Sequence, residues 1–176
     1  YTNKRQDEYG GDIENRVKFH CEVVKEVRKK IGTGVTLGIR ISQTKINDFE
    51  YEWPGQVKDA SVIFSNISKA GADYIHISTH KGLVEVFDSG RNLASFAKEY
   101  SGIKVIGCGG LQNPEKAQEL LNDGDADFIA IAKGALADPS LPKKIDSGIR
   151  PLDFDPGMIS PVATIKNTRD WKFNIS

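Results

Sequence analysis

Residues 105–136 read VIGCGGLQNPEKAQELLNDGDADFIAIAKGAL, and this stretch decides the fold. A short apolar run ends in small residues at Gly107–Gly110. A helical pattern follows, and a second apolar run, Phe128–Ile131, ends in Ala132-Lys133-Gly134. Two buried strands that each open onto small residues let backbone N–H groups approach an anion closely. The stretch therefore predicts a phosphate-binding site on two neighbouring strands, as in the last two strand–helix turns of many (β/α)₈ barrels.

The same alternation of strand and helix continues outside this stretch. Apolar spacings of three and four residues predict helices at 13–31, 57–70, 92–100 and 114–122, and short apolar runs predict strands at 35–42, 73–78, 103–106 and 128–131. Strands that alternate with helices form a parallel sheet, so the predicted fold class is α/β. The pattern alone fits two architectures, namely half of a (β/α)₈ barrel or a small doubly wound sheet. Residues 1–148 are expected to form one unit, and 149–176 an irregular, Pro-broken C-terminal tail.

The overall composition excludes several classes of function. The 176 residues hold 24 Lys and Arg against 24 Asp and Glu, so nothing points to nucleic acid or to an anionic membrane surface. No apolar run is long enough to span a bilayer, and the N-terminal residues do not resemble a signal peptide. The two cysteines, Cys21 and Cys108, lie far apart in sequence. This spacing fits neither a disulfide framework nor a metal cluster, and it indicates a cytoplasmic protein.

Four residues of the central stretch are candidates for holding the phosphate. Gly109 and Gly110 let the backbone come close to an oxyanion, and Lys133 adds a positive charge just after the next strand. Gly134 is expected to free the backbone at the start of the following helix. The alternative is that the two glycines only make a tight turn and that Lys133 is a solvated charge. Two such turns on sequential strands favour phosphate binding.

Arg40 is the second candidate, because it interrupts the apolar strand 35–42 near its carboxyl end. A buried arginine must be paired or bound to something negative. The carboxyl ends of the strands form the active-site face of a parallel α/β sheet, where an arginine suits a developing anion. An ion pair with a neighbouring carboxylate is the alternative.

Other polar residues of the strands have weaker claims to a function. His76 alternates with isoleucines and is expected to be a satisfied core histidine. Thr79, His80 and Lys81 follow its strand at the active-site end, within reach of a substrate. Cys108 lies between glycines and is expected to be a small buried residue rather than a nucleophile.

The segment before the first helix carries the most specific motif of the chain. Residues 3–19 read NKRQDEYGGDIENRVKF, which by itself predicts a structured loop and a helix start capped by Asp12. The segment closely resembles the N-x-R-x-D-x-Y-G-G-[ST]-x-E-N-R motif of the Old Yellow Enzyme family, the NAD(P)H-dependent flavin oxidoreductases. Asp12 stands in place of the usual Ser or Thr. The order of the later elements is similar too, so the resemblance covers about residues 1–140.

The resemblance implies that this chain is the second half, strands five to eight, of an FMN-binding (β/α)₈ TIM barrel. Arg40 matches the arginine that contacts the flavin ring at its N1/O2 edge, where a cation favours the anionic reduced flavin. Gly109 and Gly110 fall where the family binds the FMN phosphate. Ala132 and Lys133 fall where the family usually has Gly-Arg, also at the phosphate. Lysine keeps the charge there but loses the planar fork of arginine.

The resemblance also implies a reaction. NADH or NADPH would reduce FMN, and reduced FMN would pass hydride to an electron-poor, activated alkene, the small-molecule substrate. The family's substrate-anchoring pair, a His with a His or Asn, falls just before Tyr1, so no catalytic residue is expected in this chain. The expected partner is the N-terminal half of the barrel, without which the fragment should be inactive because its sheet edges are exposed. A homo-oligomer is compatible with this reading.

Two other functions stay open on the sequence. One is a non-catalytic flavin- or phosphate-binding half-barrel module, degenerate at Lys133. The other is a phosphosugar isomerase or aldolase built on the same barrel. The N-terminal motif, and the lack of Schiff-base surroundings for Lys133, count against the second.

Overall fold

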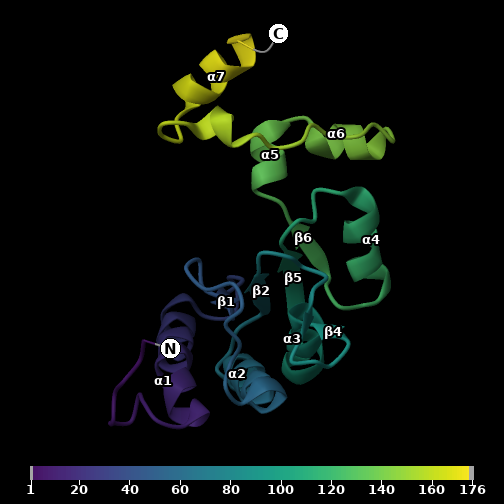
Figure 1. The fold of residues 1–176 in the computed structure, drawn as a ribbon. Coiled ribbons are helices and arrows are strands. Elements are labelled where there is room, and N and C mark those ends of the chain that lie inside the picture. Colours follow the sequence, from purple (N-terminus) through teal and green to yellow (C-terminus); the bar gives the residue numbers. More distant parts are fainter. Residues whose placement is uncertain (1, 175–176) are drawn as a thin grey trace. The chain divides into compact units, whose positions relative to one another are not determined.

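The computed structural model describes residues 2–174 of the chain. They form two compact units (Figure 1). The first is made of residues up to 111 together with 115–130, and the second of 112–114 together with the residues from 131 onward. The first unit holds the strands of the main sheet and the helices that cover it. The second holds the helices that follow the last strand.

A four-stranded parallel sheet is the centre of the first unit. Its strands are β1 (Gly38–Ser42), β2 (Tyr74–Ser78), β5 (Lys104–Cys108) and β6 (Phe128–Ala130). They lie in the spatial order β1-β2-β5-β6, and each neighbouring pair is parallel. The predicted α/β class and the four predicted strands are confirmed. Within the described residues, β1 and β6 are the two edges of this sheet.

One helix precedes each strand of the sheet. These helices are α1 (Ile13–Ile31), α2 (Gln56–Lys69), α3 (Leu93–Ser101) and α4 (Pro114–Asn122). α2 packs against both α1 and α3, and Figure 1 shows the three helices side by side. The four predicted helices are thus confirmed, with ends that differ from the prediction by at most one residue.

The first helix shows why the sequence folds in this way. Val17, Cys21 and Val24, spaced by three and four residues, are its buried side chains. Asp12 occupies the N-cap position as predicted, but its side chain accepts no hydrogen bond from the helix. Gly32 ends the helix with a φ of +69°, a conformation that strains residues with a Cβ.

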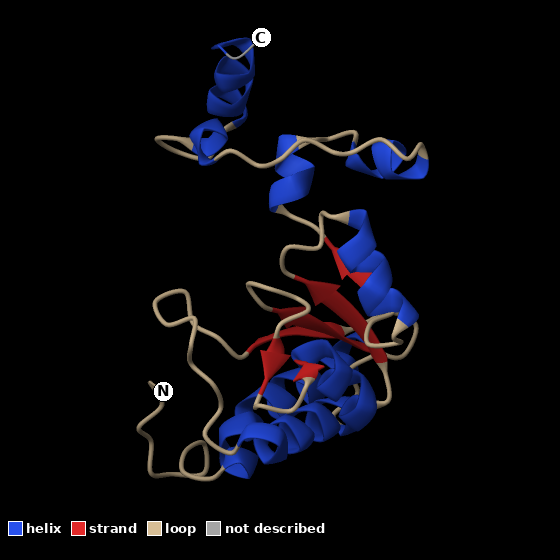
Figure 2. Ribbon diagram, turned by 45° about the vertical axis from the view of Figure 1, so that its right-hand side comes forward, coloured by secondary structure: helices blue, strands red, loops and turns tan. Residues whose placement is uncertain are grey.

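The helices cover only one face of the sheet. Ile75 and Ile77 of β2 and Val105 of β5 are at most 1% exposed, whereas the residues between them are partly or fully exposed. Successive strand residues point to opposite faces, so one face is packed and the other, the open face, is not covered by the described residues. Figure 2 shows helices grouped on one side of the strands.

A short antiparallel pair, β3 (Glu85–Val86) with β4 (Arg91–Asn92), lies where the sequence predicts a loop without pattern. Two residues per strand are too few for an alternating pattern to be read. The turn between the strands places Phe87 and Asp88 at φ values of +62° and +48°. The buried ring of Phe87 holds this turn against the core, where it lies 5.6 Å from the ring of Phe96.

The second unit consists of short helices. They are α5 (Lys133–Ala137), α6 (Leu141–Asp146), a 3₁₀ helix (Pro156–Ile159) and α7 (Ile165–Asn174). The segment from 149 onward, expected to be irregular, therefore contains two helical stretches. Pro142 and Pro156 lie in the first turn of an element, where the missing N–H costs nothing, so these prolines start helices rather than break them. The predicted unit boundary at 148 stays a prediction.

Candidate functional site

Four side chains stand in one row across the open face of the sheet. The strand register pairs Arg40 with His76, His76 with Ile106, and Ile106 with Phe128. Register partners of a parallel sheet point to the same face. Arg40 and Phe128 are exposed, and the two residues between them are partly buried. We call these four residues the flavin row, after the cofactor that the family resemblance implies. The row places a cation beside an apolar surface.

The guanidinium of Arg40 is aimed toward the carboxyl end of the sheet. Its Nη2 donates a hydrogen bond of 2.9 Å to Oγ of Ser78. The register partner of Arg40 is His76, so Ser78 lies two residues further toward the carboxyl end of β2. Among the described residues, Arg40 forms no ion pair, so the alternative of a neighbouring carboxylate is not supported. The expectation that Arg40 is buried is wrong, because the open face of the edge strand β1 is uncovered.

His76 differs from the predicted satisfied core histidine. Its Nε2 is buried and has no hydrogen-bond partner among the described residues. Burial, and then the nearby charge of Arg40, lower the pKa of the imidazole below its ordinary value of 6.5. His76 is therefore neutral at neutral pH, and it adds no second positive charge beside Arg40.

The two glycines after β5 have different structural roles, although both have a positive φ, of +106° at Gly109 and +69° at Gly110. A Cβ on Gly109 would lie 2.5 Å from the carbonyl oxygen of Thr79 and 2.9 Å from N of Gly82. Gly109 thus permits two loops to pack closely, and its carbonyl accepts a 2.7 Å hydrogen bond from N of Gly82. A Cβ on Gly110 would meet no atom within 4 Å, so this backbone borders open space.

Ala132 and Lys133 are exposed residues of the second unit. Lys133 begins α5, and its Nζ lies 5.8 Å from the ring centroid of Phe154, within the range of a cation–π contact. Gly134 is buried within the helix, and a Cβ there would lie 2.5 Å from Cβ of Gln112. Gly134 therefore provides room for Gln112, and its expected role of freeing the backbone at the helix start stays a prediction. The phosphate role of Ala132 and Lys133 stays a prediction.

The cysteines have structural surroundings. Sγ of Cys108 donates to the carbonyl oxygen of Ile77 at 3.1 Å, and burial raises the pKa of the Cys21 thiol. In the described part of the chain, no group of three or more His, Cys, Asp or Glu side chains is placed to hold a metal ion. Nor does this part contain a helix with the length and apolar character needed to cross a membrane.

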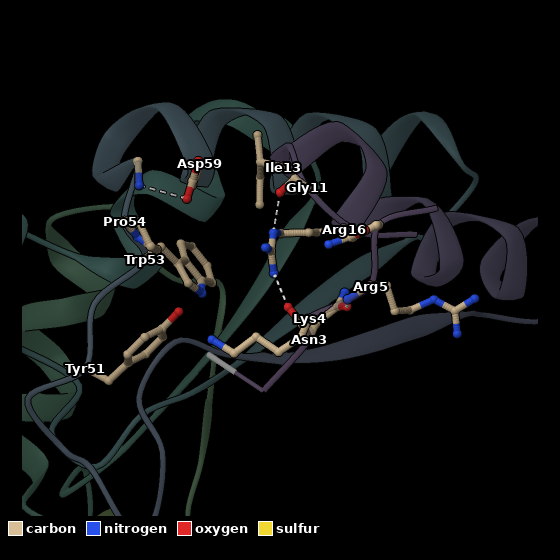
Figure 3. Close-up of a pocket in the computed structure, with 12 residues that line it drawn as sticks. Asn3, Lys4, Arg5, Gly11, Ile13, Arg16, Tyr51, Trp53, Pro54 and Asp59 are labelled. Atoms are coloured by element: carbon tan, nitrogen blue, oxygen red, sulfur yellow. Dashed lines mark hydrogen bonds between the residues drawn. The ribbon is translucent and has the colours of Figure 1, made fainter. Parts of the chain in front are cut away.

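The N-terminal motif forms a loop that is tied to the first helix. Nδ2 of Asn3 donates to the carbonyl of Tyr9 at 2.7 Å. Arg16 donates from Nε to the carbonyl of Gly11 at 2.5 Å and from Nη1 to the carbonyl of Asn3 at 3.2 Å, as Figure 3 shows. The predicted structured loop is confirmed, and these contacts explain the polar side chains of the motif without assigning them a reaction.

A pocket of about 730 Å³ lies beside this loop. Trp53 and Tyr51 form one wall, and Figure 3 shows the amino group of Lys4 directed toward the ring of Tyr51 while Arg5 points away from it. Arg5 instead pairs with Asp7. Aromatic side chains and the N-terminal loop together line this pocket.

A second pocket, of about 560 Å³, lies at the carboxyl ends of β1 and β2, and we call it the β1–β2 pocket. Thr79, His80 and Lys81, which the sequence placed at the active-site end, line it. The sequence reasoning missed the opposite wall, which comes from segment 43–52. A usable signal was Gln43, a polar residue that follows Ile41 at the alternating spacing of buried strand residues.

The sequence pattern of the NADH:flavin oxidoreductase / NADH oxidase family matches residues 1–151. The chain belongs to this family. The resemblance to the Old Yellow Enzyme family is thereby confirmed on most of the chain rather than on one motif.

The relatives of this chain are longer than it is. A metal reductase from Desulforamulus reducens is 35% identical over 157 residues, which cover 84% of this chain and 23% of that protein. An NADH oxidase from Thermoanaerobacter brockii is 28% identical over 156 residues, with the same two coverages. A structure of morphinone reductase in complex with tetrahydroNAD matches with a TM-score of 0.75 at 27% identity, over 95% of this chain and 44% of that one. The fold is therefore part of the family's TIM barrel.

Proposed function

We propose that this chain is strands five to eight of an FMN-binding barrel. The natural protein would use NADH or NADPH to reduce FMN, and it would then reduce an activated alkene. The observation that carries the proposal is the exposed guanidinium of Arg40, held at the carboxyl end of β1 without a carboxylate partner. An exposed cation at this end of a parallel strand is placed for an anionic ligand edge.

The flavin row fits one edge of an isoalloxazine ring. The Ser78 hydroxyl fixes one nitrogen of the Arg40 guanidinium, and the remaining N–H groups are left for acceptor atoms such as flavin N1 and O2. Ile106 and Phe128 continue the row with apolar surface, which suits the flat ring system. Neutral His76 separates the cation from that surface without adding charge.

The phosphate end of the cofactor is proposed to lie at the glycines after β5. Gly110 borders open space and has a positive φ, so its backbone can face a phosphate oxygen without a side chain in the way. The carbonyl of Gly109 holds this loop in place by accepting a hydrogen bond from N of Gly82. By family resemblance, Ala132 and Lys133 are phosphate-binding positions too: Ala132 would offer a backbone N–H and Lys133 a positive charge.

FMN, when bound, supplies the hydride transfer from the nicotinamide to the β-carbon of the alkene. The residues of this chain would hold and tune it. Arg40 stays charged throughout and stabilises negative charge at the ring edge, while Ser78 keeps the guanidinium oriented. No described residue of the flavin row is placed as a proton donor, so the proton that completes the alkene reduction is proposed to come from the other half of the barrel.

The open face and the two sheet edges support the half-barrel assignment. In a closed barrel the inner face is filled by side chains and every strand has two neighbours. Here Phe128 is 57% exposed, and β1 and β6 each have one neighbouring strand among the described residues. We therefore propose the N-terminal half of the barrel as the partner that covers both. The cytoplasmic location and a homo-oligomeric state stay predictions.

An absorbance spectrum of the natural protein tests the proposal. The protein should carry a flavin spectrum that NADH or NADPH bleaches without oxygen and that an electron-poor alkene restores. A colourless protein that takes up no added FMN would contradict it. Flavin that is bound but never bleached by either nucleotide would instead identify a non-catalytic binding module. Retention of a sugar phosphate in place of FMN would identify the phosphosugar barrel.

A further inference from the structure

We propose that the β1–β2 pocket binds a small organic cation that also carries a carbonyl oxygen. The pocket lies between segment 43–52, which follows β1, and segment 79–93, which follows β2. Its volume of about 560 Å³ is in the range of small-molecule sites. The proposal does not depend on flavin binding, since it rests on different side chains from those of the flavin row.

The first observation is a buried amide without a partner. Gln43 is 2% exposed and lines the pocket, yet its Nε2 makes no hydrogen bond in the described part of the chain. A buried amide without a hydrogen bond is unfavourable, so the site is more stable once an acceptor enters. A carbonyl oxygen of a ligand is such an acceptor.

The position of Gln43 separates this site from the flavin row. Ile41, two residues earlier, is buried under the helices, whereas Arg40 and Ser42 are exposed on the open face. Gln43 is buried like Ile41. The amide therefore belongs to the packed side of the sheet, and the carboxyl end of β1 presents a cation on one side and an amide on the other.

The second observation is an excess of negative charge around the amide. Four carboxylates line the pocket against a single Lys81: Glu50, Glu52, Glu85 and Asp88. Two of these have structural tasks, because Glu52 accepts a 2.9 Å hydrogen bond from N of Phe87 and Glu85 accepts one of 2.7 Å from N of Gly90.

The other two carboxylates are free to meet a ligand. Among the described contacts, neither Glu50 nor Asp88 makes a hydrogen bond or an ion pair, and both lie on the rim of the pocket. Two uncompensated carboxylates near a neutral amide donor favour a ligand with a positive group at one end and a neutral acceptor at the other.

Aromatic rings indicate that the cation is organic. The rings of Phe49 and His80 lie 4.7 Å apart between centroids, and both side chains line the pocket. Aromatic faces attract ammonium and guanidinium groups, which also bury their carbon atoms against the rings. A metal ion would need three or more converging ligands, and none of the described carboxylates or imidazoles forms such a group.

Isothermal titration of the natural protein, as it is purified, with L-argininamide tests the proposal. This probe has a guanidinium and a carboxamide oxygen. Agmatine keeps the cation but lacks the carbonyl, and pentanamide keeps the carbonyl but carries no positive charge. We expect L-argininamide to bind more tightly than either of them. The Gln43→Leu variant should bind L-argininamide about 5- to 10-fold more weakly, the effect of one hydrogen bond, and agmatine as the wild type does.

A second pair of variants keeps the proposal testable if Gln43→Leu does not fold. Glu50→Gln and Asp88→Asn change exposed side chains, and asparagine tolerates the positive φ of residue 88. Each should weaken L-argininamide and agmatine alike and make binding less sensitive to salt. No binding of L-argininamide at millimolar concentration overturns the proposal, as does equal affinity for pentanamide. The flavin absorbance of the same samples reports separately on the proposed cofactor site.

Discussion

Arg40 and Ser78 are joined diagonally across β1 and β2 by a hydrogen bond of 2.9 Å, although the register of the strands pairs Arg40 with His76 and Ser78 with Ser42. The guanidinium is thus drawn one row toward the carboxyl end of the sheet. This position, rather than the mere presence of an arginine in the strand, is what makes the residue available to a ligand at the active-site end.

Arg40→Met should change the reduction of the bound flavin strongly and the stability of the fold only a little. The variant loses a cation that stabilises the anionic reduced ring, so its midpoint potential should fall and its reduction by NADH or NADPH should slow by about 10- to 100-fold, the effect of one charged hydrogen bond. Anaerobic stopped-flow reduction and a redox titration measure the two effects. Unfolding should change little, because Arg40 is exposed.

Ser78→Ala is the matched variant for that experiment. It removes the hydrogen bond that orients the guanidinium but leaves the charge of Arg40 in place. We expect a smaller loss of rate, of about 3- to 10-fold, as for one neutral hydrogen bond. Equal rates in wild type, Arg40→Met and Ser78→Ala would show that the flavin edge lies elsewhere.

His76 should make the stability of the protein fall in mildly acidic solution. Burial and then Arg40 lower the pKa of His76 in the folded state, so below pH 6.5 the unfolded chain binds the proton more readily. Stability therefore decreases as the pH falls below 6.5 and stops decreasing once the folded imidazole is protonated too. Urea unfolding at pH 7.5 and 5.5 measures the difference. It should shrink in His76→Asn and persist in His20→Asn, which removes an exposed imidazole.

Patterns of buried residues made the fold of the first unit predictable. Strands such as β2 alternate isoleucines with polar residues, and α1 repeats apolar residues at helical spacing, so each shows its buried side in the sequence. The pair β3–β4 was not predictable in this way, because its strands have two residues each. The segment from 149 onward was misread because prolines were taken as helix breakers, although Pro156 starts a helix.

The candidate site was predicted in part. Arg40 was selected because a charge interrupts an apolar strand, and that reasoning depends only on local sequence. Its exposure depends on what covers the open face, which the strand itself does not encode. Gln43 was overlooked for a related reason: its burial and the state of its amide depend on how the chain folds around it, which residue 43 itself does not encode.

Gly109→Ala should destabilise the protein and weaken FMN binding. Its Cβ would lie 2.5 Å from the carbonyl oxygen of Thr79, and φ is +106°, so the loop that leads to Gly82 must move. Gly110→Ala also has a positive φ but meets no neighbouring atom of the described residues, so without FMN it should cost only the backbone strain of about 1 to 2 kcal/mol. Its further effect should appear only with FMN, because the added Cβ would border the phosphate. Thermal unfolding with and without FMN compares the two variants. A larger loss for Gly110→Ala without FMN would contradict the assigned roles.

Asp127 should be the main source of acid sensitivity among the carboxylates near the sheet. Burial raises its pKa, but hydrogen bonds from Lys104 at 2.8 Å, Lys98 at 2.7 Å and N of Val105 at 2.9 Å outweigh burial and lower the pKa to about 2. Its folded pKa is depressed, so it stabilises the fold by about 2 kcal/mol above pH 3.8, a contribution lost as the pH falls through 2. Asp127→Asn should remove that contribution at pH 7 in urea unfolding. Asp123→Asn, at the end of α4, is the control.

Lys133→Arg should tighten FMN binding if Lys133 contacts the phosphate. Arginine can donate two parallel hydrogen bonds to a phosphate where lysine acts as a point charge, so the dissociation constant should fall by about 3- to 10-fold. Lys133→Met removes the charge and should weaken binding by at least as much, while Phe154→Leu removes only the aromatic neighbour of the ammonium group. Fluorescence quenching of FMN, titrated at low and at high salt, separates these effects. Identical FMN affinity in Lys133→Arg and Lys133→Met would show that the ammonium group stays on Phe154 and takes no part in the cofactor site.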